Sequence, residues 1–512
     1  MKKTSYFIVV WAIFLASVSC AQGQHPKSVM AFNVSMENPQ THCFNVIFCC
    51  QGLKGATQDF KIPVWMPGYY GIIDYAGKVQ DFTAEDGSGN PLRWQKVAHN
   101  TWRIATENTT SCTVSYGVKA DVQFIVNSYL DEKRAYIAPV GVFMHVDGQI
   151  RHPVTVTVEP YKEWNDIATG LDPIPGKTNT FSALNFDILY DCPILIGNLE
   201  RLSFEVKGIP HAFVGWDLGD FDRVQFTSEL KRTVESASAV IGEFPYTHYT
   251  FLAVGPGQGG IEHLNSTAFS FNGFNRESSR NFRRFLSFLA HEYFHVYNVK
   301  TIRPIELGPF DYDRDNRTSM LWMSEGFTVY YQNLILRRSG FFTPDDFLES
   351  LSSTIAGFEN RPGRLVQSAA QSSYESWDQG PFGGDPEVSI SYYEKGAALG
   401  LLLDLKIRHE TRGRKSLDDV ITSLYRQYYK EKNRGFTEQE FWEVCEDIAE
   451  VSLKELVDYA NTTKEIDYPK YLGYAGLAVE LPRETGEPGY RIKRVPHPSP
   501  DQAAIYREWI SE

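Results

Sequence analysis

The stretch FLAHEYFHVYNVKTIRP, residues 288–304, limits the fold of this 512-residue chain more than any other feature. It places His291 and His295, two of only 12 histidines, four positions apart, with Glu292 directly after the first. On an α-helix, residues i and i+4 lie on one face with Cβ atoms about 5–6 Å apart, so both imidazoles can bind one cation. Glu292 points to the side, where it can contact a metal-bound water without being a ligand. This is the division of roles in the H-E-x-x-H pattern of zinc hydrolases.

The competing interpretation is a packed amphipathic helix that happens to carry two histidines. The run FLSFLAHEYFHVY is apolar enough to be buried in this way. A zinc hydrolase needs a third protein ligand and an open fourth position for water. The residues downstream of His295 therefore decide between the two interpretations.

The third ligand distinguishes the classes of H-E-x-x-H proteins. A metzincin would have Gly at position 298 and His at position 301, but this chain has Asn298 and Thr301. A gluzincin takes a carboxylate from a second helix, and LWMSEGFTVYYQNLILRR supplies Glu325 near its start, after the candidate cap Ser324. We therefore predict Glu325 as the third ligand. Its rivals lie in a loop with Pro and Gly that is less able to aim a ligand: Glu306, Asp311, Asp313 and Asp315.

The segment GGIEH, residues 259–263, follows a predicted strand. Its glycines, Gly259 and Gly260, allow a backbone to approach closely, and the Glu262 carboxylate can hold a free α-ammonium group by a charge-assisted hydrogen bond. By spacing alone, a glycine turn with a solvated glutamate is the better interpretation. Next to a zinc motif, the substrate-binding interpretation becomes the favoured one.

The chain changes character near its middle. From about Met30 to Leu202 it is rich in β-branched and aromatic residues between turn residues, as in HCFNVIFCC and PVTVTVEP, which predicts an antiparallel β-sandwich. After Phe213 it reads as mainly helical, with one strand at YTFLAV. A helix is predicted within DFDRVQFTSELKRTVESASAVIGEF, residues 220–244. The helices predicted after the strand are 276–298, 321–338, 344–357, 392–409, 417–430 and 438–449.

Residues 1–24, MKKTSYFIVVWAIFLASVSCAQGQ, contain two lysines, an apolar run and then small residues. This order is typical of a secretory signal, and the apolar run is shorter than the roughly 20 residues of a transmembrane helix. We expect residues 1–22 to be a signal peptide or a lipoprotein signal, and the protein to be exported to a bacterial periplasm or outer membrane. A lipid anchor on Cys20 is the one membrane attachment predicted, although Ser17 stands where a lipobox usually has Leu.

The overall composition excludes some functions. A formal net charge of -13 without a basic run argues against nucleic acid as a partner. The six cysteines after Cys20 show no CxxC spacing, so a cysteine metal site is not expected. The oligomeric state and any disulfide pairing stay open.

HEYFHVYNVKTIRP and WMSEGFTVYYQ together resemble the glycyl aminopeptidase family of gluzincin metallopeptidases. VWMPGYYGIIDYAGKVQDF, in the β-rich part, is similar to a second signature of that family. Tyr297 and Thr301 depart from the usual Trp and Arg, outside the ligand set. The resemblance implies a multidomain α+β chain: an N-terminal β-sandwich domain (23–205), a thermolysin-like, mainly helical zinc peptidase domain (206–465) and a short PDZ-like tail (466–512) that is too short for a whole PDZ domain.

The resemblance also implies a mechanism. One Zn²⁺ per chain is held by His291, His295 and Glu325, with Glu292 as general base. SYYEKGAALG is similar to a Tyr-x-Lys-Gly element whose tyrosine stabilises the oxyanion, which here is Tyr393. The expected function is an aminopeptidase that removes small N-terminal residues, glycine or alanine, from peptides. The alternatives are a zinc endopeptidase or oligopeptidase at the same site, and an exported peptide-binding scaffold with structural zinc.

Overall fold

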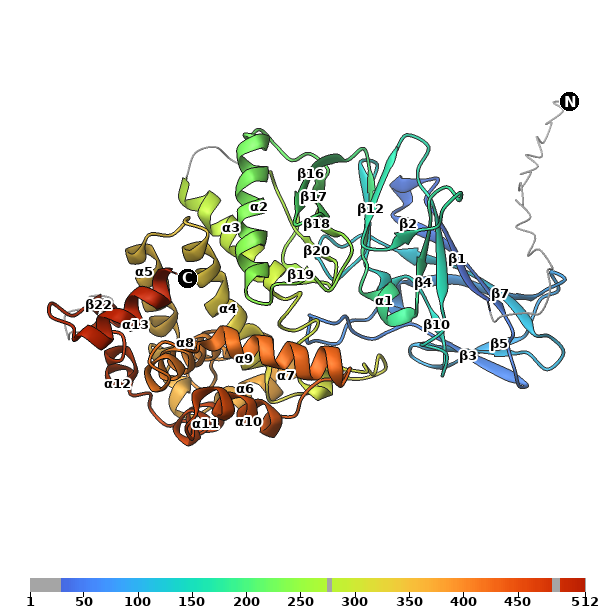
Figure 1. Ribbon diagram of the computed structural model, residues 1–512. Helices are drawn as coiled ribbons and strands as arrows, with labels where there is room; N and C mark the ends of the chain where they lie inside the picture. Colours follow the sequence, from blue (N-terminus) through green and yellow to red (C-terminus); the bar gives the residue numbers. More distant parts are fainter. Residues whose placement is uncertain (1–28, 274–278, 481–488, 512) are drawn as a thin grey trace, which may run out of the picture.

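The computed structural model describes residues 29–273, 279–480 and 489–511, with strands gathered at one end and helices at the other (Figure 1). The predicted signal and Cys20 fall outside the described residues, so export and lipidation stay predictions. In the part of the chain that is described, no helix combines the length and the apolar character that crossing a membrane requires.

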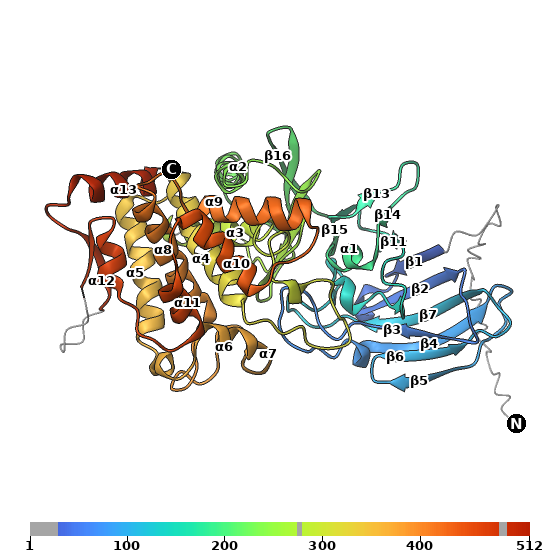
Figure 2. The same ribbon diagram turned by 60° about the horizontal axis from the view of Figure 1, so that its bottom comes forward.

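The first part of the chain is β-rich, as predicted. Its strands form a seven-stranded sheet, β13-β14-β11-β1-β2-β7-β4, and two four-stranded sheets, β10-β3-β6-β5 and β12-β15-β9-β8 (Figure 2). The strands are β1 (Val29–Ser35), β2 (Cys43–Gln51), β3 (Thr57–Lys61), β4 (Val79–Asp86), β5 (Trp94–Ala98), β6 (Thr101–Ala105), β7 (Ser111–Lys119), β8 (Tyr129–Leu130), β9 (Arg134–Ile137), β10 (His145–Val146), β11 (Val154–Glu159), β12 (Asp166–Thr169), β13 (Asp172–Pro173), β14 (Thr180–Ala183) and β15 (Ile194–Gly197), with helix α1 (Phe186–Tyr190) between β14 and β15.

The sheet pairing differs from the predicted sandwich in one respect. β1 is antiparallel to β2 but parallel to β11, with Ala31 opposite Thr155. The period-2 pattern fixes which side chains face the core and says nothing about which distant strand pairs with which. Along β2, the alternate residues Phe44, Val46 and Phe48 are buried, so the pattern itself holds.

A five-stranded sheet, β16-β17-β18-β20-β19, lies between the β-rich part and helices α2 (Arg223–Ala239) and α3 (Ser279–Phe294) (Figure 1). Phe213 and Phe251 pack into the helical core, whereas their neighbours Val214 and Leu252 pack into the core of the β-rich part. The strands β17 and β18 are therefore covered on both faces and are mostly apolar, whereas the edge strand β16 is partly exposed. Its strands are β16 (Glu200–Val206), β17 (Ile209–Gly215), β18 (Tyr249–Ala253), β19 (Gly260–Glu262) and β20 (Ser266–Phe269).

The remaining helices form the second end of the molecule. They are α4 (Leu321–Arg338), α5 (Pro344–Glu359), α6 (Ala369–Tyr374), α7 (Ser376–Gln379), α8 (Tyr392–Glu410), α9 (Leu417–Leu424), α10 (Glu438–Ala449), α11 (Lys454–Asn461), α12 (Tyr468–Gly473) and α13 (Pro500–Ser511). α4 and α10 have the predicted bounds. The segment predicted as helix over 417–430 is α-helical only to Leu424 and continues as a π-helix over Tyr425–Glu431.

Two glycines let α4 and α8 touch backbone to backbone. A Cβ added at Gly326 would lie 2.4 Å from the Cα of Gly396, and one added at Gly396 would lie 2.0 Å from the carbonyl oxygen of Trp322. This close approach leaves no room for a side chain at either position. It brings Gly396, near the start of α8, beside Gly326, the residue that follows Glu325 on α4.

Two of the predicted domains can be compared with local features of the structure. The predicted limit at 205/206 falls near the end of β16, which pairs with β17 in one sheet. In the predicted PDZ-like tail, β21 (Leu477–Glu480) and β22 (Arg491–Arg494) form a hairpin, and α13 packs on α4. These described parts of the tail share the core of the helical region; their PDZ-like character stays a prediction.

Trp509 on α13 anchors the tail, so its loss should be costly. It is fully buried, and its indole N–H donates to the hydroxyl of Tyr330 at 2.7 Å. We expect Trp509→Ala to lower the free energy of unfolding by about 3–5 kcal/mol, measured by denaturant titration. Val224→Ala, at a position 82% exposed, is the control and should change it by less than about 0.5 kcal/mol. Equal effects would show that the tail is not part of the folded core.

Candidate active site

Three side chains from two helices converge at one point. His291 lies on α3, His295 lies one residue beyond its last helical position, and Glu325 is the fifth residue of α4. The Nε2 atoms of His291 and His295 are 3.1 Å apart, and Glu325 Oε2 lies 3.5 and 3.2 Å from them. The chain thus brings the three predicted ligands together, within 4.8 Å of one another.

The opposite nitrogen of each imidazole is held by an oxygen acceptor. His291 Nδ1 donates to Gln332 Oε1 at 2.9 Å, and His295 Nδ1 donates to the Asn298 carbonyl at 2.7 Å. These bonds fix the tautomer and leave each Nε2 with a bare lone pair. Asn298 is itself hydrogen-bonded to α4: its side-chain amide donates to the Met323 and Ser324 carbonyls.

The donor set fits a zinc ion. Two bare imidazole nitrogens and a carboxylate oxygen that lacks a hydrogen-bond partner face one another in a buried space, which is unfavourable without a cation. Without a metal, burial opposes protonation of His295, but the Glu325 carboxylate outweighs it and raises the pKa of His295 well above its usual range. Two histidines and one carboxylate are a usual ligand set of catalytic zinc, with a position left for water.

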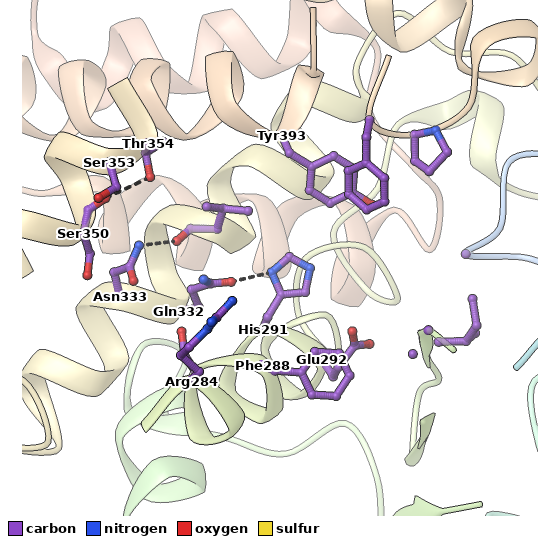
Figure 3. Close-up of a pocket in the computed structure, with 18 of the residues that line it drawn as sticks. Arg284, Phe288, His291, Glu292, Gln332, Asn333, Ser350, Ser353, Thr354 and Tyr393 are labelled. Atoms are coloured by element: carbon purple, nitrogen blue, oxygen red, sulfur yellow. Dashed lines mark hydrogen bonds between the residues drawn. The ribbon is translucent and has the colours of Figure 1, made fainter. Parts of the chain in front are cut away.

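Glu292 lies beside the triad and has the properties of a proton acceptor in a dry site. It is buried and lines the same cleft as His291 (Figure 3). Burial raises the pKa of Glu292 to about 8, the Glu262 and Glu325 carboxylates add to the rise, and His295 opposes it. A cation bound at the triad would lower this pKa again.

Glu262, at the end of edge strand β19, lines a small pocket that adjoins this cleft, because Gly68 and Tyr70 line both. A Cβ added to Gly68 would lie 2.8 Å from Glu262 Oε2, so a loop of the β-rich part closes directly over this carboxylate. Gly259, at φ +88°, and Gly260 are equally constrained: a Cβ at Gly260 would lie 2.5 Å from Phe288 and 2.9 Å from Glu292 Oε1. Gly260 therefore permits close packing against α3, and Gly259 permits close packing against Ile125 of the β-rich part.

The two adjacent tyrosines at the start of α8 have different surroundings. Tyr393 lines the cleft, and its ring lies 6.3 Å from the His291 ring, close to parallel. Tyr392 is fully buried, and its hydroxyl has no hydrogen-bond partner in the described chain. The position that faces the cleft is the predicted Tyr393. A third tyrosine, Tyr70 from the β-rich part, also lines the cleft.

A buried charged cluster holds the strand of Glu262 in place. The Asp191 carboxylate accepts from Lys300 Nζ at 2.5 Å, from His263 Nδ1 at 3.1 Å and from the Leu264 backbone at 2.9 Å. Burial alone would raise the pKa of Asp191, but Lys300 and His263 lower it to about 2. His263 therefore supports the β-rich part against the site and does not face the metal ligands.

The loop carboxylates that were alternatives to Glu325 as the third ligand bind other residues. Asp311 pairs with Arg314, Asp313 with Lys61, and Asp315 with Arg317, while Glu306 accepts from Thr318. Sequence reasoning missed Gln332 and Tyr70. Gln332 lies seven residues after Glu325 on the same helix face, a spacing that could have indicated it. Tyr70 lies within the signature VWMPGYYGIIDYAGKVQDF, but that pattern does not show that its loop reaches the site.

The triad opens into a cleft of about 1070 Å³. One end is walled by the β-rich part, through Gly68, Tyr69, Tyr70, Phe124 and Ile125. The other end runs between α3, α4 and α5, past Phe288, Gln332 and Ser350 (Figure 3). The cleft has the extended shape that a peptide requires.

Solved structures share this fold. An aminopeptidase N family protein from Idiomarina loihiensis is similar with a TM-score of 0.83 and 27% identity, over 90% of this chain and 81% of that chain. An M1 zinc metallopeptidase from Deinococcus radiodurans is similar at 13% identity and a TM-score of 0.53, over 86% of this chain and 95% of that chain. A mutant of the latter bound to a Tyr-Ser-Ala substrate has a TM-score of 0.54. No curated protein matches this chain significantly.

The fold and the three-ligand cluster define a zinc metallopeptidase, and its relatives make it an aminopeptidase. Residues 31–198 match the Peptidase M61 N-terminal domain, and residues 284–399 match the M61 glycyl aminopeptidase model. The chain belongs to the M61 glycyl aminopeptidase family, which confirms the resemblance found in its sequence.

Proposed function

We propose that this zinc aminopeptidase removes small N-terminal residues, glycine or alanine, from peptides, with Glu292 as general base and Glu262 as the anchor for the free amine. The observation that carries the proposal is the state of Glu262. Its side chain is buried beside the metal site, and its carboxylate has no hydrogen-bond or ion-pair partner among the described residues. A buried, unpaired carboxylate is costly unless a ligand completes it.

A substrate α-ammonium group is the natural partner for Glu262. It supplies a positive charge and three N–H donors to a carboxylate that is shielded from water. Glu262 lines a pocket that adjoins the end of the cleft walled by the β-rich part, where Gly68 and Tyr70 line both, so a chain held there extends in one direction only. This geometry supports release of the first residue.

The small size of the favoured first residue is supported by the wall opposite Glu262. The Gly68 backbone lies against the carboxylate, and Tyr69 and Phe124 pack edge to face, with ring centroids 5.5 Å apart, beside it. Ile125 lies against Gly259, with its Cγ2 2.9 Å from the position of an added Cβ. Little space is left for a large first side chain.

The residues of the site suggest how the peptide bond is cleaved. Zinc held by His291, His295 and Glu325 supplies Lewis-acid chemistry, which polarises a carbonyl and makes water more acidic. Glu292 accepts the proton of the attacking water and passes it to the leaving amine. The Tyr393 hydroxyl donates to the carbonyl oxygen as negative charge develops on it. The free edge of β19 offers backbone groups that align the substrate.

Two observations favour this function over its alternatives. Against a structural zinc, the side chain of His291 is 13% exposed toward the cleft, and the three ligands leave a coordination position on that side. Against an endopeptidase, Gly68 and Tyr70 wall the cleft on the side of Glu262, where residues before the scissile bond would have to pass.

Blocking the substrate amine tests the role of Glu262. We expect Ala-Ala-Ala to be cleaved and its N-acetylated form to be cleaved at least about 100-fold more slowly, because acetylation removes the charge that Glu262 binds. Glu262→Gln should lower kcat/KM for the free peptide by about the same factor, with unchanged zinc content, measured by release of alanine. Equal cleavage of the free and acetylated peptides would refute the aminopeptidase proposal and favour the endopeptidase.

A further inference from the structure

The far end of the cleft, beyond the metal site, follows one face of α3. Arg284, Phe288 and His291 are spaced i, i+4 and i+7, so they lie in a row on that face (Figure 3). Arg284 lies seven residues before His291, about 10 Å along the helix axis. On the opposite wall, Ser350, Ser353 and Thr354 of α5 follow the same length of the cleft.

The hydrogen-bonding groups at this end are mostly acceptors. The hydroxyls of Ser350, Ser353 and Thr354 each donate to a backbone carbonyl of α5, so their oxygens are left to accept. The Asn333 amide donates to the Val329 carbonyl. A bound peptide needs donors for its carbonyls. Among the described side chains at this end of the cleft, the donor groups without any partner are the amide nitrogen of Gln332 and the guanidinium of Arg284.

Arg284 differs from its neighbour Arg283 in its partners. Arg283 forms an ion pair with Asp346 of α5 at 3.6 Å. Arg284 has no ion pair or hydrogen bond with any residue that the structure describes, and it extends toward the part of the cleft lined by Gln332 (Figure 3). On the opposite wall, Glu349 precedes Ser350 on α5 and lines the cleft. It has no ion pair among the described residues.

We propose that Arg284 binds the C-terminal carboxylate of short substrates, so that this site prefers tripeptides and tetrapeptides with a free C-terminus. The inference rests on the proposed function, because it takes Glu262 as the anchor of the N-terminus. An extended chain advances about 3.3 Å per residue, so the distance of about 10 Å from His291 to Arg284 spans about three residues. The guanidinium fork suits a carboxylate bidentately. Among the described residues that line this end of the cleft, Arg284 is the cationic side chain without an ion pair.

The test compares peptides that differ only at the C-terminus. Ala-Ala-Ala and its C-terminal amide both carry a free N-terminus, and we expect the wild-type enzyme to cleave the acid with about tenfold higher kcat/KM, mainly through a lower KM. In Arg284→Gln the ratio of acid to amide should fall to about one. In the matched control Arg283→Gln, whose arginine is already paired, the ratio should stay near ten.

Each outcome separates this inference from the proposed function. A ratio near one in the wild type, or a tenfold ratio that survives in Arg284→Gln, overturns the role of Arg284 while leaving the aminopeptidase intact. Failure of the wild type to release alanine from both peptides overturns the proposed function and this inference with it. A preference lost equally in both arginine variants also overturns the assignment, because it would reflect the general charge of α3.

Discussion

Glu292→Gln is expected to lower kcat by about 10³-fold while the enzyme keeps its zinc. Glutamine has the shape of glutamate but cannot accept a proton from water, and no other carboxylate in the described cleft lies in the same position beside His291. Because Glu292 is not one of the three converging ligands, the metal content should not change. The measurement is kcat for a small alanine substrate together with zinc analysis of the same sample.

A matched control uses the same change elsewhere in the cleft. Glu349→Gln alters an exposed carboxylate on the opposite wall and should change kcat by less than about twofold. Full activity in Glu292→Gln would contradict the assignment of the general base. Loss of zinc together with loss of activity would instead place Glu292 among the groups that hold the metal.

The second large effect is expected for Glu325→Gln, which should weaken zinc binding by more than about 100-fold. Glu325 supplies the anionic ligand, and its buried carboxylate balances the charge of the cation between His291 and His295. Activity should fall in parallel with bound zinc. The measurement is a competition titration of the metal-free protein with a zinc-binding indicator.

A residue that orients a ligand should have a smaller effect than the ligand. Gln332→Ala removes the acceptor for His291 Nδ1 and should weaken zinc binding by about 10–100-fold. Asn333→Ala changes the next residue along α4, which bonds its own helix, and should leave zinc affinity near the wild-type value. Equal zinc affinities in Glu325→Gln, Gln332→Ala and Asn333→Ala would contradict the metal site.

Much of the fold could be predicted because the local patterns are strong. The bounds of α10 follow from its capping box, Thr437 with Glu440, and those of α4 from its apolar spacing. The predicted cap Ser324 is wrong, because α4 begins three residues earlier, at Leu321, without a side-chain cap. The alternation in β2 identifies its buried face. The parallel pairing of β1 with β11 and the covering of β17 and β18 on both faces were missed. Both depend on contacts between residues far apart in the chain, which periodicity does not encode.

The site also contains residues that could be predicted from the sequence and residues that could not. His291, His295 and Glu325 could be predicted because helical spacing and ligand chemistry constrain them. Gln332 and Asn298 act through geometry that appears only when α3 and α4 are packed together. Tyr70 and Gly68 reach the cleft from the β-rich part, and no short-range pattern reveals a contact between domains. Arg284 became a candidate only because the structure shows Arg283 paired and Arg284 not.

The most direct measurement of the central claim is to titrate zinc into chelator-treated protein while following release of the N-terminal residue from a glycine-containing peptide. The metal-free protein is expected to be inactive, and activity should rise in proportion to bound zinc and level off at one zinc per chain, as the single cluster of three ligands in the described residues indicates. An undiminished rate of glycine release in the metal-free protein would contradict the account.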